Sequence, residues 1–482
     1  MIMIYNTGFY CYNYRIKNIY KITFMQIIQR GALVMSFRKD FMWGAASAAY
    51  QVEGAFDADG KGMSIWDEYC HDDGRIKFNE NGDVSCDHYH RYKDDIALMK
   101  KIGLKCYRFS VSWTRIIPDG DGKINEKGLD FYSDLVDELI KNDIEPLVTL
   151  FHWDYPAALH KKGGWLNDES PEWFLNYAEQ VVNRLSDRVK YWITINEPQI
   201  FIGNGYQKGV FAPYYCLGKK DLIHISHNVL LAHGKTVKMI RETAKIKPAI
   251  GFSPTGPCFI PKDNEPETIE TARKRSFSIE EGEGFIYSNS WWSDPVFLGR
   301  YPEKAYEIFD GIMPDIKDGD MELISQPLDF YAVNLYQNHL DIEANYKQGA
   351  AKTQLGWYVS PDLMYWASKF LYERYGLPVM ITENGLACHD WISLDGKVHD
   401  PNRIDFIARY LKSLKKAAED GVEIIGYMYW SVMDNLEWAD GYDPRFGLVY
   451  VDYQTQERTI KDSGFWYGRV IESNGEILDD MG

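Results

Sequence analysis

Short segments of strand character, separated by stretches of helical periodicity, constrain the fold more than any other feature of this chain. After the strand-like segment that starts at Trp43, for example, Ile96, Met99 and Ile102 recur at helical spacing. Strands that alternate with helices form parallel sheets, and eight such units close into a barrel. The sequence therefore predicts an α/β fold, a single (β/α)8 TIM barrel with long strand-to-helix loops. The predicted strands start at Trp43, Lys105, Glu145 and Lys190 and then lie at 249–253, 329–333, 377–383 and 423–430.

The barrel is expected to span residues 35–482 as one catalytic domain. Residues 1–34 carry basic but no acidic side chains, and charges interrupt their apolar residues too often for the core of a signal peptide. We expect an N-terminal extension outside the fold, with Met35 as the initiator, or alternatively an amphipathic arm that binds a surface. The longest excursion, residues 255–289, is rich in Glu, Lys and Ser and is interpreted as a charged loop or helix without chemistry.

Charge and cysteine usage restrict the partners and the compartment. Lys and Arg total 53 against 70 acidic residues, and no basic stripe with interleaved aromatics is present, so nucleic acid is not an expected partner. No segment approaches the ~20 apolar residues of a membrane span. The seven cysteines are scattered and form no CxxC pair, as is typical of reduced thiols. We therefore expect a cytoplasmic protein. The sequence is compatible with a homo-oligomer but does not decide the oligomeric state.

Two carboxylate motifs each end a predicted strand. Thr194-Ile195-Asn196-Glu197-Pro198 and Ile381-Thr382-Glu383-Asn384-Gly385 place a glutamate where β-forming residues give way to Asn with Pro or Gly. Either glutamate alone would more often be a surface-loop carboxylate. Two carboxylates that converge on one bond are, however, what glycoside hydrolysis needs. Because the catalytic ends of barrel strands share one rim, we predict that Glu197 and Glu383 meet there.

Aromatic and polar side chains accompany these motifs at other predicted strand ends. The chain contains 15 Trp and 34 Tyr, and flat aromatic faces beside carboxylates suit sugar rings, although a Trp-rich core is an equal alternative. For Gln51 the alternative is a loop amide, for His152 it is a satisfied core histidine, and for Glu437 it is a solvated loop acid. The candidate sugar-binding residues at these strand ends are Gln51, His152, Trp430 and Glu437.

From about Phe37 onward the sequence resembles glycoside hydrolase family 1, the retaining β-glucosidases. The resemblance rests on five motifs in the family's order: Phe-Met-Trp-Gly-Ala-Ala at 41–46, Tyr-Arg-Phe-Ser at 107–110, Thr-Ile-Asn-Glu-Pro at 194–198, Ile-Thr-Glu-Asn-Gly at 381–385 and Asn-Leu-Glu-Trp at 435–438. It implies hydrolysis of terminal non-reducing β-D-glucosyl residues in cello-oligosaccharides and in aryl or plant β-glucosides. No metal or organic cofactor is implied, because two carboxylates suffice.

The resemblance also implies a role for individual residues. Glu197 would be the acid/base and Glu383 the nucleophile, with Arg108 and Tyr336 orienting Glu383. The sugar-binding residues that it implies are Gln51, His152, Trp153, Asn196, Trp357, Trp430, Glu437, Trp438 and Phe446.

Two alternatives accompany this prediction. A 6-phospho-β-glucosidase would need Ser, Lys and Tyr in the loop after the last strand, where this chain has Trp438, Pro444 and Phe446, and Glu437 would repel a phosphate. A non-catalytic sugar-binding protein on the same fold would lack one of the two glutamates. The preference for glucose over galactose or fucose, the aglycone and the extent of transglycosylation stay undecided.

Overall fold

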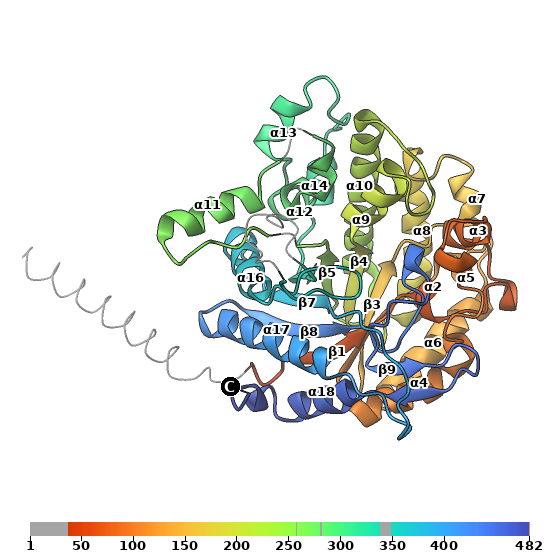
Figure 1. Cartoon of the computed structure of the whole chain (residues 1–482). Helices are drawn as coiled ribbons and strands as arrows, with labels where there is room; N and C mark the ends of the chain where they lie inside the picture. The colour runs from red at the N-terminus through yellow and green to blue at the C-terminus, as the bar shows by residue number, and fades with distance from the viewer. Residues whose placement is uncertain (1–36, 257, 280–281, 338–348, 482) are drawn as a thin grey trace, which may run out of the picture.

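The computed structural model describes residues 37–256, 258–279, 282–337 and 349–481. The N-terminal extension predicted at residues 1–34, and Cys11 with it, lie outside the described residues. In Figure 1 the strands form a central barrel and the helices surround it.

Eight parallel strands close into a barrel in sequence order, with β1 paired to β8. The predicted (β/α)8 fold is therefore confirmed, and each predicted strand overlaps an observed one. Most of the side chains in these strands are buried, because helices cover the outside of the barrel while side chains fill its interior. The strands are β1 (Met42–Ala46), β2 (Cys106–Ser110), β3 (Glu145–Phe151), β4 (Tyr191–Asn196), β5 (Ala249–Ser253), β6 (Phe330–Asn334), β7 (Val379–Asn384) and β8 (Ile424–Trp430).

Amphipathic helices connect the strands and pack against the barrel. In α4, the predicted face of Ile96, Met99 and Ile102 is buried, and Gly103 ends the helix with a left-handed φ of 97°. The longer helices are α4 (His88–Ile102), α6 (Glu126–Lys141), α8 (Ser170–Leu185), α10 (Lys219–Thr243), α11 (Pro266–Ser276), α12 (Asn289–Leu298), α16 (Asp362–Tyr375), α17 (Pro401–Glu419) and α18 (Asp462–Glu472).

Short elements occupy the loops. They matter for function because the loops at the carboxyl ends of the strands surround the barrel mouth. The short helices are α2 (Ala49–Val52), α3 (Ile65–His71), α5 (Trp113–Ile116), α7 (Ala157–His160), α9 (Pro198–Ile202), α13 (Glu303–Ile308) and α14 (Asp320–Ile324), and an antiparallel pair, β9 (Val449–Val451) with β10 (Arg458–Ile460), follows β8.

Candidate active site

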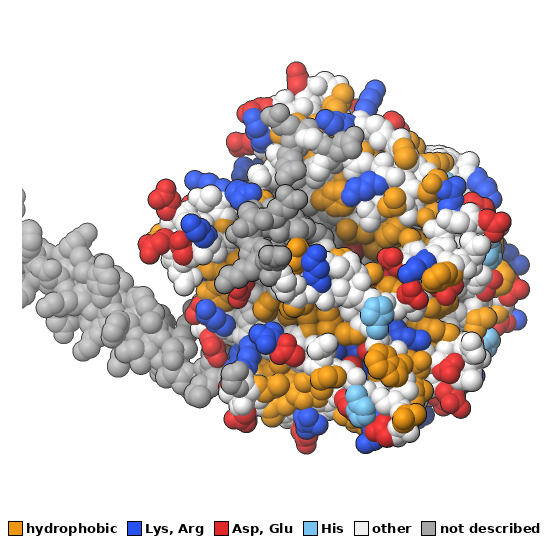
Figure 2. Space-filling model, in the orientation of Figure 1, with side chains coloured by type: hydrophobic (Ala, Val, Ile, Leu, Met, Phe, Trp, Pro, Cys, Tyr) orange, Lys and Arg blue, Asp and Glu red, His pale blue; other side chains and the backbone are white. Residues whose placement is uncertain are grey.

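A pocket of about 550 Å³ opens at the carboxyl ends of the barrel strands, and both predicted glutamates line it. Figure 2 shows a hollow on this face of the molecule with hydrophobic side chains on its walls. Ten of the thirteen predicted site residues line the pocket: His152, Trp153, Glu197, Tyr336, Trp357, Glu383, Trp430, Glu437, Trp438 and Phe446. A concave, aromatic-lined cavity with a few convergent polar groups is the usual form of a small-molecule site.

Glu383 is held from two sides. It belongs to β7 and is 4% exposed. Arg108 Nη1 donates to its Oε1 at 2.6 Å, and the Tyr336 hydroxyl donates to its Oε2 at 2.8 Å. Burial raises the pKa of Glu383, but the Arg108 charge and the Tyr336 hydrogen bond oppose that rise. Both carboxylate oxygens thus have a donor that favours the ionised form.

Glu197 has a different environment, without a cation of its own. It follows β4 with a φ of 43°, a left-handed conformation that is costly for a non-glycine residue and is concentrated at functional sites. Asn334 Nδ2 donates to its Oε1 at 2.9 Å. Burial, followed by the charge of Glu383, raises the pKa of Glu197 to about 8. At neutral pH the carboxyl group therefore carries a proton.

Asn196 connects the surroundings of the two glutamates. Its Oδ1 accepts from Arg108 Nη2 at 2.6 Å and from Asn334 Nδ2 at 3.0 Å. These two bonds fix the amide orientation, so that its Nδ2 points to His152 Nε2 at 3.1 Å. Burial and the nearby Arg108 lower the pKa of His152 well below its usual value, which leaves a neutral imidazole able to accept this bond.

Aromatic rings form much of the pocket wall. Trp153 and Trp438 lie with ring centroids 4.5 Å apart, and the His152 ring is stacked against Trp430 at 5.8 Å. Trp357 and Phe446, 6.2 Å apart, form a second group of rings. Such surfaces can pack against the apolar face of a sugar or an aromatic aglycone.

Three predicted site residues do not line the pocket. Arg108 and Asn196 act behind it, through the contacts described above. Gln51 is fully buried in α2, and its Nε2 donates to the Leu436 carbonyl at 2.7 Å. Its Oε1 and the Oε2 of Glu437 are buried without a hydrogen-bond partner among the described residues. Buried polar atoms of this kind are usually satisfied, so a partner from outside the described residues would complete both.

Sequence reasoning missed two parts of the site. Asn334, which contacts Glu197, ends β6 two residues before the predicted Tyr336. Its position at a strand end was the sequence feature that could have identified it. The segment 255–289, to which no chemistry was assigned, contributes one pocket wall with Phe259, Arg275 and Tyr287. That interpretation was incomplete because α11 is polar and the stretches around it are irregular, so the sequence does not reveal which side faces the barrel mouth.

The described residues contain no helix long and apolar enough to cross a membrane. They also contain no group of three or more His, Cys, Asp or Glu side chains arranged to hold a metal ion.

Comparison with known proteins identifies the family. The family model for glycosyl hydrolase family 1 matches residues 33–476. The 1,4-β-D-glucan glucohydrolase of Thermotoga neapolitana is 44% identical over 451 residues, which cover 91% of this chain and 99% of that protein. An aryl-phospho-β-D-glucosidase of Bacillus subtilis is 38% identical, with 92% and 98% covered.

A solved structure agrees with the fold throughout. The β-glucosidase from Thermotoga maritima in complex with glucoimidazole has a TM-score of 0.84 and 42% sequence identity, and the match covers 91% of this chain and 99% of that one. The resemblance noted in the sequence is thereby confirmed: the chain belongs to glycosyl hydrolase family 1 and is a glycoside hydrolase.

Proposed function

We propose that this protein is a retaining β-glucosidase, with Glu383 as the nucleophile and Glu197 as the acid/base. The observation that carries the proposal is the asymmetry between two carboxyl groups in one pocket. Glu383 is paired with Arg108, while Glu197 forms no ion pair among the described residues and has a pKa raised to about 8 by burial and by Glu383. Two carboxyl groups whose environments separate their protonation states can divide the acid and the nucleophile between them.

In the first half-reaction, Glu383 attacks the anomeric carbon and forms an ester bond to it. The bond from that carbon to the aglycone oxygen breaks, and Glu197 delivers its proton to this oxygen. Arg108 and Tyr336 keep the Glu383 oxygens aimed until the bond forms. The transition state has oxocarbenium character, which the remaining negative charge of Glu383 stabilises.

In the second half-reaction, a water molecule hydrolyses the glycosyl ester. Once Glu383 is esterified, its negative charge no longer raises the pKa of Glu197. Glu197 becomes more acidic and accepts the proton of the attacking water. The two displacements together retain the configuration at the anomeric carbon, and they require carboxyl groups only about 5–5.5 Å apart.

The sugar would lie among the aromatic rings, with its hydroxyls facing the polar groups. Glu437 lines the pocket with an unpartnered Oε2, suited to a sugar hydroxyl, and Asn196 beside the acid suits the 2-hydroxyl. The other proposed contacts are those that the family resemblance implies: Trp430 under the ring, Trp357 beside the aglycone, and Gln51, His152, Trp153, Trp438 and Phe446 around the glycone. Cello-oligosaccharides and aryl or plant β-glucosides are the proposed substrates, in keeping with the glucan glucohydrolase and β-glucosidase activities named for the Thermotoga relatives.

The closest alternative is a 6-phospho-β-glucosidase, the activity named for the Bacillus subtilis relative. Burial, with Asp440, Glu383 and Glu197, already raises the pKa of Glu437 well above its usual value, so this part of the pocket resists a further negative charge. Among the described pocket-lining residues the cations are Lys208 and Arg275, on the wall that follows β4 and β5. A phosphate beside Glu437 would lack a countercharge.

A substrate comparison tests the proposed function. We expect kcat/KM for 4-nitrophenyl β-D-glucoside to exceed that for its 6-phosphate by at least about 100-fold, since an unpaired charge contact of this kind costs several kcal/mol. Initial rates of nitrophenol release from both substrates give the ratio. A preference for the phosphorylated substrate would assign the chain to the alternative. Absence of turnover on both, with sugar binding intact, would favour a non-catalytic sugar-binding protein.

The pH dependence of kcat/KM is expected to be bell-shaped, with its alkaline limb near pH 8. Glu197 must be protonated to act as the acid, and burial together with Glu383 raises its pKa to about 8. Activity is therefore present below this pH and is lost as the pH rises through it. A profile of kcat/KM from pH 4 to 10 checks the limb. An alkaline limb that persists unchanged in Glu197→Gln would contradict the assignment.

We further propose a reducing, cytoplasmic environment. Cys70, Cys86, Cys106 and Cys258 are buried as free thiols, while Cys216 is exposed and Cys388 is partly exposed. A free exposed thiol is compatible with a compartment that keeps cysteines reduced. A role in cellulose degradation and a homo-oligomeric state remain predictions.

A further inference from the structure

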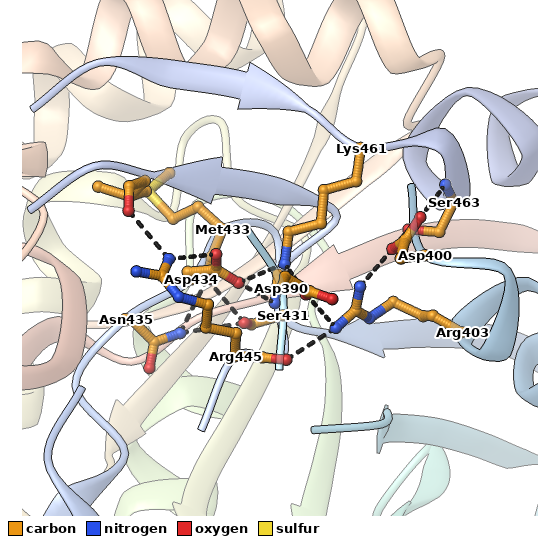
Figure 3. A network of polar contacts seen from close by, with 12 residues as sticks. Asp390, Asp400, Arg403, Ser431, Met433, Asp434, Asn435, Arg445, Lys461 and Ser463 are labelled. Carbon is orange, nitrogen blue, oxygen red and sulfur yellow. Dashed lines mark hydrogen bonds and ion pairs between the residues drawn. The ribbon is translucent and has the colours of Figure 1, made fainter. Parts of the chain in front are cut away.

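A buried network of alternating charges lies beside the pocket, behind the loop that carries Glu437 (Figure 3). It runs from Asp400 through Arg403, Asp390, Lys461 and Asp434 to Arg445, and each neighbouring pair forms an ion pair. Three carboxylates alternate with three cations, so the network is electrically balanced. Its side chains come from the loop after β7, from α17, from the loop after β8 and from the residue before α18.

Asp434 joins the two ends of the segment 431–447, called the 431–447 loop below. Its Oδ1 accepts from the Gly447 backbone N–H at 2.9 Å, and its Oδ2 accepts from Arg445 Nη1 at 2.8 Å. One fully buried carboxylate therefore joins the beginning of the loop to its end. Glu437, Trp438 and Phe446 lie between these points, and all three line the pocket.

Lys461 ties this closed loop to the strand that carries Glu383. Its ammonium is fully buried and donates to Asp434 Oδ1 and to Asp390 Oδ2, each at 2.6 Å. Asp390 lies in the loop that follows β7, and it also accepts from Arg403 Nη2 at 2.6 Å. Charge-assisted hydrogen bonds away from water are strong and directional, so Lys461 helps to set how the two loops lie relative to each other. The Cys388 backbone N–H and Arg403 Nη2 contribute as well, because both donate to the Arg445 carbonyl, at 3.0 and 2.8 Å.

Glu437 is the pocket residue that this network can position. Asp434 lies three residues before it, and the Glu437 Oε2 atom is buried without a partner among the described residues. Resting on the proposed function, we propose that Lys461, through Asp434 and Asp390, is a positioning residue that holds Glu437 for recognition of a glycone hydroxyl. Lys461 does not line the pocket and does not take part in the bond-breaking steps.

The charge balance of the network allows its positioning role to be separated from its contribution to stability. Lys461→Met alone leaves an uncompensated buried carboxylate, which is costly. The double variant Asp390→Asn with Lys461→Met keeps two balanced pairs, Asp400 with Arg403 and Asp434 with Arg445. It removes the Lys461 link between the loops without leaving a surplus charge, while the bond from the Cys388 N–H to the Arg445 carbonyl remains. It therefore serves as the variant that folds if the single one does not.

The experiment compares 4-nitrophenyl β-D-glucoside with its 4-deoxy and 6-deoxy analogues. In the wild-type protein, the analogue that lacks the hydroxyl held by Glu437 should lose about tenfold or more in kcat/KM, the value of one charge-assisted hydrogen bond. In the double variant this penalty should shrink to less than about threefold, because a misplaced Glu437 no longer distinguishes the two substrates.

Lys415→Met is the matched control. Lys415 Nζ pairs with Asp479 at 2.6 and 2.7 Å, and neither residue lines the pocket. This variant should keep the wild-type deoxy penalty. An unchanged penalty in the double variant, or an equal loss of kcat/KM on all three substrates, would overturn the positioning role. A wild-type protein that hydrolyses glucosides without any deoxy penalty would overturn it too, and a wild-type protein without hydrolysis would refute the proposed function itself.

Discussion

Replacing Glu383 by alanine is expected to lower kcat for 4-nitrophenyl β-D-glucoside by about 10⁴-fold or more, the scale seen when a covalent nucleophile is removed. The variant has no atom to attack the anomeric carbon, and Arg108 and Tyr336 lose the group that they hold. Steady-state rates on purified protein measure the loss. Glu423→Ala is a suitable control, because that glutamate is half exposed just before β8, at the opposite rim, and should leave kcat within about twofold.

The same variant allows the direction of attack to be examined. Removing the carboxyl group opens a space beside Arg108 that a small anion such as azide can enter. Azide would then attack the face opposite the leaving group and give an α-glucosyl azide, which NMR distinguishes from the β-anomer. Restored turnover with the α-product supports Glu383 as the nucleophile. An undiminished rate in Glu383→Ala without azide would exclude this role.

The barrel could be predicted because the residue pattern of each strand and helix lies within one short stretch of the sequence. The strands are buried, so they read as apolar runs, and α4 reads as an amphipathic helix because Ile96, Met99 and Ile102 face the core. The rim position of both glutamates followed from the rule that parallel strands share one carboxyl end. The residues named from the family resemblance also lie in or behind the pocket, and their individual roles stay predictions.

The family resemblance implied the contacts of Arg108 and Tyr336 with Glu383. Other contacts that tune the site could not be predicted, because they join residues far apart in sequence. Lys461 meets Asp390 across 71 positions, and Asn334 meets Glu197 across 137. No spacing rule connects such pairs, since their proximity exists only once the barrel has closed. The burial that raises the pKa of both glutamates is likewise a property of the closed barrel, which the sequence does not display.

Replacing Glu197 by glutamine should produce a defect that depends on the leaving group. For cellobiose we expect kcat/KM to fall by about 10³-fold, within the range supplied by general acid catalysis. The alkoxide leaving group of cellobiose needs the proton that Glu197 holds and glutamine lacks. For 2,4-dinitrophenyl β-D-glucoside the loss in kcat/KM should stay below about tenfold, because that phenolate leaves without protonation.

The activated substrate should also expose the second role of Glu197. Glu383 remains intact in this variant and can still form the glycosyl ester, but no base is left to activate the water. The ester should therefore accumulate, giving a burst of dinitrophenol followed by a slow steady state, and intact-protein mass spectrometry should detect one bound glucosyl group. Because Asn334 Nδ2 can still donate to a glutamine carbonyl, the variant keeps its local contact and the comparison isolates proton transfer. Equal losses on cellobiose and on the dinitrophenyl substrate, without a burst, would show that Glu197 does not protonate the departing oxygen.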